Sequence, residues 1–522
     1  MDTKALRQKI LDLAIRGKLV PQDPSDEPAS VLLERIREQK KQMVKEGKLK
    51  AKDIKNDTII FVGEDNLHYE KFQDGSVKCI EEEIPFEVPE GWAWCRLNSI
   101  VDVRDGTHDT PTYVDKGIPL ITSKNLVEGG IDYSNVKYIS EKDAISINDR
   151  SGVNIGDILF AMIGTIGNPS MVTEDILISI KNVALFKFTF SKNLSNHFVM
   201  YFLDYAQEDM KNKPSGGLQP FVSLNFLRTY LVPVPPVEEQ QRIVSILADS
   251  INKIRNIDVL KNELTASVKK AKSKILDLAI RGKLVPQDPN DEPASVLLER
   301  IRVEKEELIK QGKIKRDKKE SIIFRGDDNS YYEKIGDDIE NIDTEIPFNL
   351  PDNWIWCRGC SCFSGMETTK PQGEFFDYID IDSIDNRLHC IKKTKRIPVI
   401  EAPSRASRAI NSGSVLFSLV RPYLENIALI EEIHSHSIAS TGFYVCNSNG
   451  LLLPDYMFYL MISKYVVDGL NQYMKGDNSP SISRNDIENW LYPIPPIDEQ
   501  RRICYILKTT FATIEKLEES LI

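Results

Sequence analysis

Thiol groups that could bind a metal ion are the first chemistry that the sequence suggests. Cys357 and Cys360 form a Cys-x-x-Cys pair, Cys362 follows closely, and His389-Cys390 comes later. A structural zinc site takes four such ligands, usually as two spaced pairs. The sequence has no second Cys-x-x-Cys, and Cys95 stands alone at the matching place in an earlier segment. We therefore predict buried thiols here rather than a metal site.

Catalytic motifs of other kinds are also missing from the sequence. A phosphate-binding P-loop needs Ser or Thr after its Gly-Lys pair, because that hydroxyl binds the magnesium ion. Neither residue follows any of the Gly-Lys pairs, which lie at 17–18, 47–48, 282–283 and 312–313. The nearest approach to the adenine-methyltransferase tetrapeptide, Asn168-Pro169-Ser170, lacks its second proline. We therefore expect no catalytic centre in this chain.

Basic side chains are concentrated in one short segment. Residues 387–408 contain seven of them against a single carboxylate, Glu401, so the local charge is +6 in a chain whose net charge is −11. The seven are Arg387, Lys392, Lys393, Lys395, Arg396, Arg405 and Arg408. Lys and Arg at this density suit the phosphates of nucleic acid, but a solvated charged face has the same composition. The pattern by itself leaves both interpretations open.

The length and composition are those of an ordinary globular chain with roughly two to four domains. Acidic residues outnumber basic ones, 78 to 67, which excludes a uniformly basic coat for nucleic acid but not a local basic patch. No apolar run reaches the roughly 18 residues of a membrane span, and Asp2 and Arg7 interrupt the segment where a secretory signal would be apolar. The eight cysteines are irregularly spaced, as in a reduced compartment. We expect a cytoplasmic protein.

The sequence segments that must position these residues occur twice in the chain, as an internal repeat. Residues 9–37 and 274–302 are identical except for Ser25 against Asn290. A repeat of roughly 260 residues is far too long for a solenoid and indicates tandem domains. Two further pairs of segments match, and between them the copies share almost nothing. In these two pairs, residues 84–96 match residues 346–358, and residues 233–243 match residues 493–503. We predict a common scaffold that carries two unlike domains.

The scaffold is predicted to be helical. After a Pro-Pro pair, apolar residues recur at a mean spacing of about 3.5, the coiled-coil period. In the central helix they are Ile243, Leu247, Ile251, Ile254, Ile257, Leu260, Leu264, Val268, Ala271, Ile275 and Leu278, and in the C-terminal helix Ile503, Leu507, Phe511, Ile514, Leu517 and Leu521. An uninterrupted helix over 237–280 would be about 66 Å long. We expect an N-terminal helix, ended by Gly17 as its C-cap, and the C-terminal helix to fold against it.

The unlike segments, about 96–232 and 357–492, have the pattern of mixed α/β domains. Short β-rich runs separated by Gly, Asn, Asp and Pro predict strands near 158–160, 183–188 and 414–420. Each segment finishes with a helix-like stretch, at 196–210 and 454–473, and then a polar, Gly-containing loop, at 213–219 and 475–481.

This organisation resembles the DNA-specificity subunit of Type I restriction–modification systems. The specific marks are Pro-Pro-hydrophobic-Glu/Asp-Glu-Gln-x-Arg-Ile at 235–243 and 495–503, and Ile-Pro-x-x-x-Pro-x-x-Trp at 84–92 and 346–354. Three loops of the first domain also look like that family: Asp-Gly-Thr-His-Asp-Thr-Pro at 105–111, Gly-Ile-Pro-Leu-Ile-Thr-Ser-Lys-Asn-Leu at 117–126, and Gly-Asp-Ile-Leu-Phe at 156–160. The second domain has no equivalent of Asp-Gly-Thr-His.

The resemblance implies an α+β fold in which two mixed α/β target-recognition domains are separated by a long antiparallel helical coiled coil with a pseudo-twofold internal repeat. It implies conserved helical regions at 1–83, 237–345 and 497–522, and target-recognition domains at 84–236 and 346–496. Each domain would read one half of a bipartite, asymmetric site in double-stranded DNA, and the helices would set the gap. Two methyltransferase subunits with S-adenosylmethionine, and restriction subunits that translocate and cut with ATP and magnesium, would supply all the chemistry.

Within a DNA reader, base-edge contacts come from polar loops and phosphate contacts from nearby Lys and Arg. The candidates in the first domain are Arg104, Thr107, His108, Lys124, Asn125, Ser215 and Gln219. In the second domain, the seven basic residues of 387–408 are joined by Arg421, Tyr423, Lys475 and Asn478. For the loop residues, the role of an ordinary turn residue remains the alternative.

Two other functions stay open on the sequence alone. One is a nuclease or methyltransferase that acts by itself, against which the missing motifs argue. The other is a coiled-coil adaptor that displays two peptide-binding domains and ignores DNA. A separate hypothesis concerns the repeats: surface-type residues such as Lys18, Gln22, Asp23 and Glu34 match perfectly, which suggests recent sequence exchange between the two copies.

Overall fold

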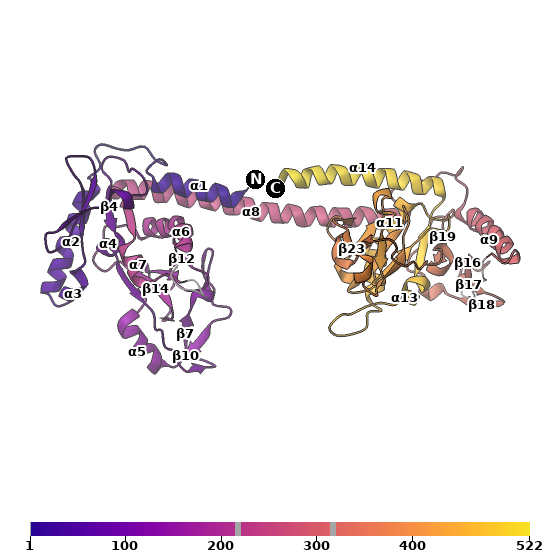
Figure 1. The fold of residues 1–522 in the computed structure, drawn as a ribbon, viewed down its shortest axis with the longest axis horizontal. Coiled ribbons are helices and arrows are strands. Elements are labelled where there is room, and N and C mark those ends of the chain that lie inside the picture. The colour runs from indigo at the N-terminus through magenta and orange to yellow at the C-terminus, as the bar shows by residue number, and fades with distance from the viewer. Residues whose placement is uncertain (1, 214–220, 314–319, 522) are drawn as a thin grey trace. The chain divides into compact units, whose positions relative to one another are not determined.

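The chain folds into two compact units, residues 1–260 and 261–522 (Figure 1). The computed structural model describes residues 2–213, 221–313 and 320–521. Helices and strands alternate in both units, so the predicted mixture of α and β structure is confirmed. Among the described residues, no helix is long and apolar enough to cross a membrane.

Unit 1 begins and ends with helices that pack on one another. Helix α1 (Thr3–Ile15) is capped by the Asp2 carboxylate and ends at Arg16, after which Gly17 adopts a φ of 64°, as a helix C-cap predicts. It lies antiparallel to the first part of α8 (Val237–Ile280), and apolar residues of both helices share one core. The other helices of unit 1 are α2 (Ala29–Lys45), α3 (Ala51–Ile54), α4 (Leu97–Ile100), α5 (Glu141–Ser151), α6 (Asn196–Asn212) and α7 (Leu224–Thr229).

The strands of unit 1 form several small sheets. The first, in the order β1-β2-β3, joins β1 (Ile59–Val62), β2 (His68–Lys71) and β3 (Val77–Cys79), and β4 (Ala93–Arg96) pairs with β15 (Leu231–Val234). The order β12-β11-β14-β5 joins β12 (Gly167–Met171), β11 (Ile158–Ala161), β14 (Val183–Lys187) and β5 (Asp102–Asp105). The order β13-β7-β10-β6 joins β13 (Ser179–Ile180), β7 (Ile118–Ile121), β10 (Lys137–Ile139) and β6 (Tyr113–Val114), and β8 (Leu126–Val127) pairs with β9 (Gly130–Ile131).

Unit 2 repeats the outer elements and differs in its inner ones. Its helices are the end of α8, α9 (Ala294–Lys310), α10 (Gly359–Cys362), α11 (Pro454–Met461), α12 (Lys464–Asn471), α13 (Arg484–Asn489) and α14 (Ile497–Leu521). Its outer sheets are β16 (Ser321–Arg325), β17 (Tyr331–Ile335) and β18 (Asp338–Asn341), and the pair β19 (Ile355–Arg358) with β29 (Leu491–Ile494).

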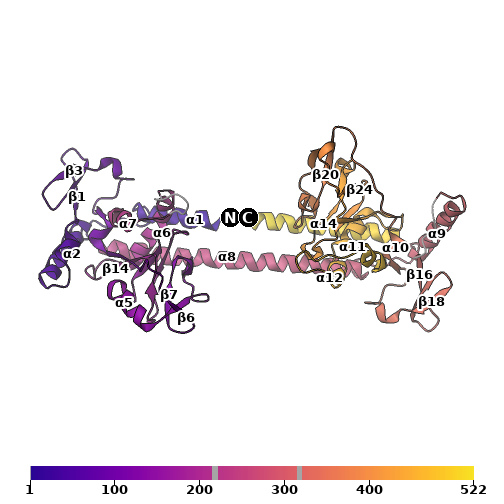
Figure 2. The same cartoon turned by 60° about the horizontal axis from the view of Figure 1, so that its bottom comes forward.

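The inner strands of unit 2 form three sheets. Figure 2 labels β20 and β24, which belong to one of them. One has the order β23-β20-β27-β24, with β23 (Lys395–Pro398), β20 (Phe375–Ile379), β27 (Ile438–Ser440) and β24 (Ala406–Ala409). Another has the order β26-β25-β28, with β26 (Ile427–Leu429), β25 (Val415–Ser418) and β28 (Phe443–Cys446). The third pairs β21 (Ile384–Asp385) with β22 (Cys390–Ile391).

Most predicted elements occur where the pattern placed them. The strand predictions near 158–160, 183–188 and 414–420 are confirmed by β11, β14 and β25, and α6 confirms the helix over 196–210. The single helix predicted over 454–473 is wrong, because the chain breaks between α11 and α12. Ile462 ends α11, and the Ser463 hydroxyl then accepts a hydrogen bond from the Val466 amide as the N-cap of α12. A new cap therefore interrupts an apolar pattern that continues through it.

The apolar seam of α8 is covered only near its two ends. Seam residues from Ile243 to Ile254 are buried, Ile257 and Val268 are half-buried, and Leu264 is 45% exposed. In unit 1 the cover ends near Asp258 because α1, which covers the seam, begins at Thr3. The Thr3 Oγ1 donates to Asp258 Oδ1 at 2.7 Å. Leu260 and Leu264, both in the predicted seam, are thus 62% and 45% exposed. In α14, Ile503 and Leu507 are buried, and Phe511 and Ile514 are half-buried.

A buried glutamate fastens the start of each scaffold helix to its unit. In unit 1, Glu239 accepts hydrogen bonds from Trp92 Nε1 at 3.0 Å and from Gln22 Nε2 at 2.8 Å. In unit 2, Glu499 accepts from Trp354 Nε1 at 2.9 Å and from Gln287 Nε2 at 2.6 Å. Burial raises the pKa of both carboxyl groups, and these hydrogen bonds oppose the rise. The repeat in sequence is therefore a repeat of contacts.

Candidate nucleic-acid interface

The Asp-Gly-Thr-His loop of unit 1 follows β5 and is held by the backbone. The Thr107 amide donates to the Ile180 carbonyl at 3.0 Å, and Asn182 donates back to the Thr107 carbonyl at 3.1 Å. Gly106 lies so close that a Cβ atom there would come within 2.3 Å of the Ile180 oxygen. The loop thus needs glycine for close approach, and its next residue is presented from a fixed base.

His108 is the exposed end of a small polar network. Its Nε2 lies 2.9 Å from Asp105 Oδ2 and its Nδ1 lies 3.0 Å from Asn182 Oδ1, while 61% of the side chain is exposed. Arg150, from α5, forms an ion pair with the other oxygen of Asp105. Burial would raise the pKa of Asp105, but the hydrogen bonds from Arg150 and His108 outweigh it and lower the pKa. The imidazole is therefore oriented by protein groups and open to a ligand.

The other first-domain candidates differ in what their side chains already bind. Arg104 pairs with Asp102 at 2.7 Å and donates to the Arg150 carbonyl, so part of its guanidinium is occupied. Lys124 is exposed. Asn125 is only 7% exposed, and its amide caps the turn at Thr122 and donates to the Asp132 carbonyl at 3.1 Å.

The structure does not support Asn125 as a DNA contact, because the turn that it caps uses its polar atoms. Ser215 and Gln219 lie outside the described residues. Sequence reasoning missed Arg150 and Lys181. Both belong to this surface, since Lys181 bonds Thr110 of the same loop. Neither lies near the loop in sequence, and only the fold brings them there.

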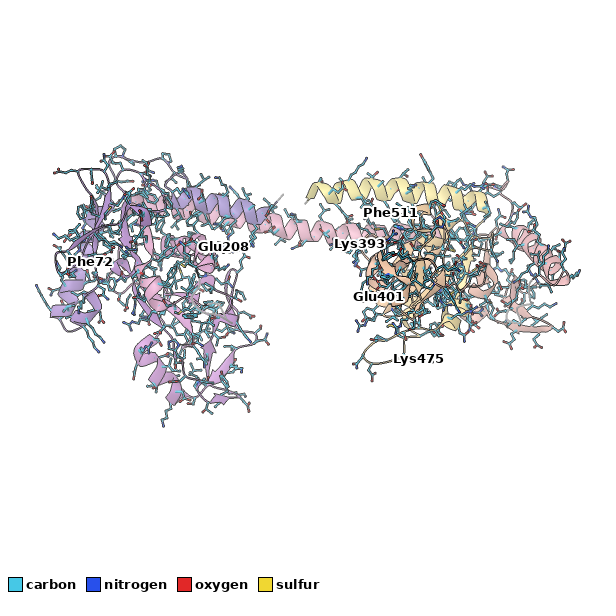
Figure 3. The ribbon with its side chains drawn as sticks, in the orientation of Figure 1. Phe72, Glu208, Lys393, Glu401, Lys475 and Phe511 are labelled. Atoms are coloured by element: carbon cyan, nitrogen blue, oxygen red, sulfur yellow. The ribbon has the colours of Figure 1, made fainter. Side chains whose placement is uncertain are left out.

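The basic segment of unit 2 is exposed, but it is not one patch. Six of its seven basic side chains are exposed, and Arg408 is half-buried. Lys395 and Arg396 lie on β23 and Arg408 on β24, at opposite edges of a four-stranded sheet. Three strand spacings of about 4.8 Å separate those edges by about 14 Å. Figure 3 labels Lys393 beside this sheet and Glu401 in the same segment.

Carboxylates outside the segment reduce its charge in the folded unit. Lys395 forms an ion pair with Asp380, and Arg396 stands opposite Asp377 in the strand register. The guanidinium of Arg396 also lies 5.7 Å from the centre of the Phe375 ring. Five exposed cations of the segment then have no carboxylate of the described residues within ion-pair distance, and four of these also lack the facing carboxylate and ring that Arg396 has: Arg387, Lys392, Lys393 and Arg405. These four are the better candidates for phosphate contact.

Arg421 and the loop at 475–481 are brought together by the fold. The Arg421 amide donates to the Pro480 carbonyl at 2.7 Å, and its Nη2 donates to the Asn478 carbonyl at 2.9 Å. Lys475 and Ser481 close the loop with two backbone hydrogen bonds of 2.9 Å. Arg421 has a φ of 47°, and its side chain and those of Lys475 and Asn478 are exposed, as is Tyr423 at 46%. Figure 3 shows Lys475 on the loop that extends from this unit.

The cysteines of the predicted thiol cluster are mostly packing residues. Cys357 and Cys362 are buried and Cys360 is half-buried. Burial, and then the hydrogen bond with Cys357, raise the pKa of the Cys362 thiol well above its usual value. Within the described ranges, no three metal-ligating side chains gather into a metal site. The prediction of buried thiols is confirmed for Cys357 and Cys362, only in part for Cys360, and wrong for Cys390, which is exposed.

Comparison with known proteins agrees with this picture. The family described as "Type I restriction modification DNA specificity domain" matches residues 89–266. This match covers the part of unit 1 that contains the candidate loops. The specificity subunit of the Escherichia coli Type I restriction enzyme EcoAI is 29% identical and covers 99% of this chain and 90% of its own. That of EcoEI, also from Escherichia coli, is 26% identical with the same coverage. The resemblance to specificity subunits is thus confirmed.

Two solved structures are also similar. The HsdS subunit from Thermoanaerobacter tengcongensis is 35% identical over 33% of this chain and 46% of that one, with a TM-score of 0.32. The S subunit from M. genitalium is 13% identical over 84% of this chain and 95% of that one, with a TM-score of 0.32. The matched residues, 89–266, include every DNA-binding candidate of unit 1, whereas those of unit 2 lie beyond them.

Proposed function

We propose that this chain is the sequence-specific DNA-binding subunit of a Type I restriction–modification complex and catalyses nothing itself. The observation that carries the proposal is similarity to specificity subunits over 99% of the chain. The domains at 84–236 and 346–496 each read one half of a bipartite, asymmetric site in double-stranded DNA.

The polar surfaces of the two units support this role. In unit 1, an exposed His108 is oriented by Asp105 and Asn182, and a fixed side chain of this kind can select a base edge. In unit 2, the exposed cations of the basic segment supply donors for phosphates. Arg421, and Lys475 on the loop to which Arg421 is hydrogen-bonded, supply further donors for phosphates and bases. The different inner sheets of the two units fit two different half-sites.

The helices serve as the spacer and the docking surface. We infer that α1, α8 and α14 act as an antiparallel coiled coil with a pseudo-twofold repeat, whose length sets the gap between the half-sites. In unit 1, the apolar side chains of Val259 and Leu260 are 50% and 62% exposed, which fits a surface that a partner subunit covers.

The partners are two methyltransferase subunits and the restriction subunits, and the complex works in the cytoplasm. S-adenosylmethionine belongs to the methyltransferase subunits, and ATP and magnesium belong to the restriction subunits. No cofactor is assigned to this chain.

Genome-wide adenine methylation, read by single-molecule sequencing with and without this gene, tests the proposal. Deletion should remove one bipartite, asymmetric methylated motif, and exchanging residues 96–232 for those of another specificity subunit should change one half-site only. An unchanged methylome in cells that express the methyltransferase would refute the DNA-reading role and favour a protein-binding adaptor.

A further inference from the structure

Unit 1 contains an open cavity of about 940 Å³ between α1, α6, α7 and the β4–β15 pair. Its walls are unusually aromatic: Phe86, Trp94, Phe202, Tyr205, Phe226 and Tyr230 all line it. None of these residues belongs to the DNA-facing loops described above. Glu208, labelled in Figure 3 below α1, also lines it.

The corresponding aromatic residues of unit 2 enclose a side chain of their own unit. Phe348, Trp356 and Trp490 are the counterparts of Phe86, Trp94 and Tyr230 in the repeat. Tyr465 lies against all three, with ring centroids 5.4 Å from Phe348, 6.2 Å from Trp356 and 5.4 Å from Trp490. Its hydroxyl donates to the Leu491 carbonyl at 2.7 Å. An aromatic side chain thus fills this place in unit 2.

The frame around the two places is the same. Phe86 and Trp94 lie 5.1 Å apart at 58°, and Phe348 and Trp356 lie 4.9 Å apart at 62°. An arginine covers each phenylalanine ring, Arg16 at 4.5 Å in unit 1 and its counterpart at 4.3 Å in unit 2. The aromatic walls are therefore built alike.

The helix break in unit 2 explains why a side chain occupies the aromatic site there and not in unit 1. The Ser195 amide donates to Gln240 Oε1 and the Leu453 amide to Gln500 Oε1, which fixes α6 and α11 as equivalent helices. After α11, Ser463 starts the new helix α12, which carries Tyr465. In unit 1, α6 runs without a break to Asn212.

The charges on the cavity wall are largely satisfied within unit 1. Arg16 pairs with Asp12 at 2.7 Å, Arg96 with Glu83 at 2.8 Å, and Lys213 with Asp209 at 2.9 Å. A charged ligand would find few unmatched partners there, whereas an uncharged ring would bury apolar surface. Leu231, the counterpart of Leu491 whose carbonyl accepts from Tyr465, also lines the cavity.

We propose that this cavity receives a tyrosine side chain presented by a partner protein. The occupant stacks on Phe86, Trp94 and Tyr230 as Tyr465 does on their counterparts, and its hydroxyl donates to the Leu231 carbonyl. The identity of the partner rests on the proposed function: it is the methyltransferase subunit that docks on unit 1.

The cavity can be tested in the full chain with 4-methylphenol, which is the tyrosine side chain without its backbone. The chain is labelled with 5-fluorotryptophan, and its five tryptophan signals in the ¹⁹F spectrum are assigned with Trp→Phe variants. The Trp94 signal should shift saturably, while the Trp356 signal stays unchanged because Tyr465 fills its place. Toluene, which lacks the hydroxyl, should bind about five- to tenfold more weakly.

Matched variants separate cavity binding from general effects. Ala5→Phe adds a ring at an exposed wall position and should abolish the Trp94 shift, whereas Lys270→Phe, at the matching repeat position, should not change it. Tyr465→Ala should make Trp356 respond to 4-methylphenol as well. No Trp94 shift in the unaltered chain, or equal shifts at Trp94 and Trp356, would overturn the cavity inference whether or not the variants fold.

The occupant is tested in the complex assembled with its methyltransferase subunits. There the Trp94 signal should lie near its 4-methylphenol position, and Ala5→Phe should weaken assembly by about tenfold or more relative to Lys270→Phe. An unchanged Trp94 signal in the complex would overturn the tyrosine assignment. Loss of the methylated motif on deletion would leave the proposed function intact in that case, so the two failures are distinguishable.

Discussion

The buried ion pair between Lys40 and Asp57 offers a stability test with an internal control. Lys40 Nζ lies 2.6 Å from Asp57 Oδ2, with 3% and 7% of the two side chains exposed, and it also donates to the Asn98 carbonyl at 3.0 Å. Lys40→Met leaves Asp57 buried without its cation. Removing one partner of such a pair costs about 3–5 kcal/mol, because an uncompensated charge stays in the interior. The unfolding midpoint of unit 1 should fall on the order of 10 °C.

The matching pair in unit 2 is the control. Lys305 lies 3.0 Å from Glu320, but 28% and 19% of these side chains are exposed. Water can solvate the carboxylate that Lys305→Met leaves behind, so we expect a loss below about 1 kcal/mol. Differential scanning calorimetry of the two variants and the parent chain measures both effects. Equal losses from the two substitutions would refute the reasoning, since burial is what distinguishes the pairs.

The loss at Lys40 should also depend on pH in a fixed direction. Burial raises the pKa of Asp57, and Lys40 is the main group that opposes the rise. Without Lys40 the folded-state pKa rises further above the unfolded value, so the folded state binds the proton more tightly than the unfolded state. Stability then increases as pH falls from 7 toward the ordinary carboxyl range and decreases as pH rises through the raised pKa. A loss that is independent of pH between 5 and 8 would contradict this account.

The candidate DNA-binding surfaces give four further predictions. Gly106→Ala should abolish recognition of the first half-site, because its Cβ would lie 2.3 Å from the Ile180 oxygen; methylome sequencing would show the second half-site alone retained. His108→Ala should leave the fold intact and relax one position of that half-site by about 1–3 kcal/mol, measured by competition between DNA duplexes. Replacing Lys392 and Lys393 by Ala should weaken binding to all sequences and lower the slope of log K against log salt by about 0.9 for each phosphate that the protein no longer neutralises. Asn125→Ala should lower the melting temperature without changing the motif, because its amide holds the turn at Thr122 and Asp132. A changed motif with an unchanged melting temperature would restore Asn125 as a DNA-binding residue.

The scaffold was predictable because its signals are local and repeated. The Pro-Pro stop and the regular apolar spacing predict a helix over 237–280, and α8 has these same bounds. The C-cap at Gly17 was predictable because glycine tolerates the positive φ that this position adopts. The break at Ser463 was missed because apolar residues continue on both sides of it, and one cap decides the outcome.

The candidate interface was less predictable because it depends on pairing between distant strands. A run of basic residues in sequence becomes two edges of a sheet once β20 and β27 lie between β23 and β24. Arg150 and Lys181 join the Asp-Gly-Thr-His loop from elsewhere in the chain, and no local pattern marks them. Arg421 and Asn478 lie in polar loops far apart in the sequence, and the fold joins them by a hydrogen bond.

The contacts of the repeats bear on how the two copies came to be so alike. Gln22 and its counterpart Gln287 are constrained, because each donates to the buried glutamate of its unit. The single difference between the long repeats also preserves a contact, since the amides of Ser25 and Asn290 both donate to the preceding aspartate at 2.9 Å. Lys18 and its counterpart are exposed, however, and nothing in the structure requires them to match. Packing therefore explains part of the identity, and exchange between the copies stays our hypothesis for the rest. Extensive synonymous differences between the codons of the two repeats would refute recent exchange. Shared contacts and partners would then be the only explanation for the identity of the repeats.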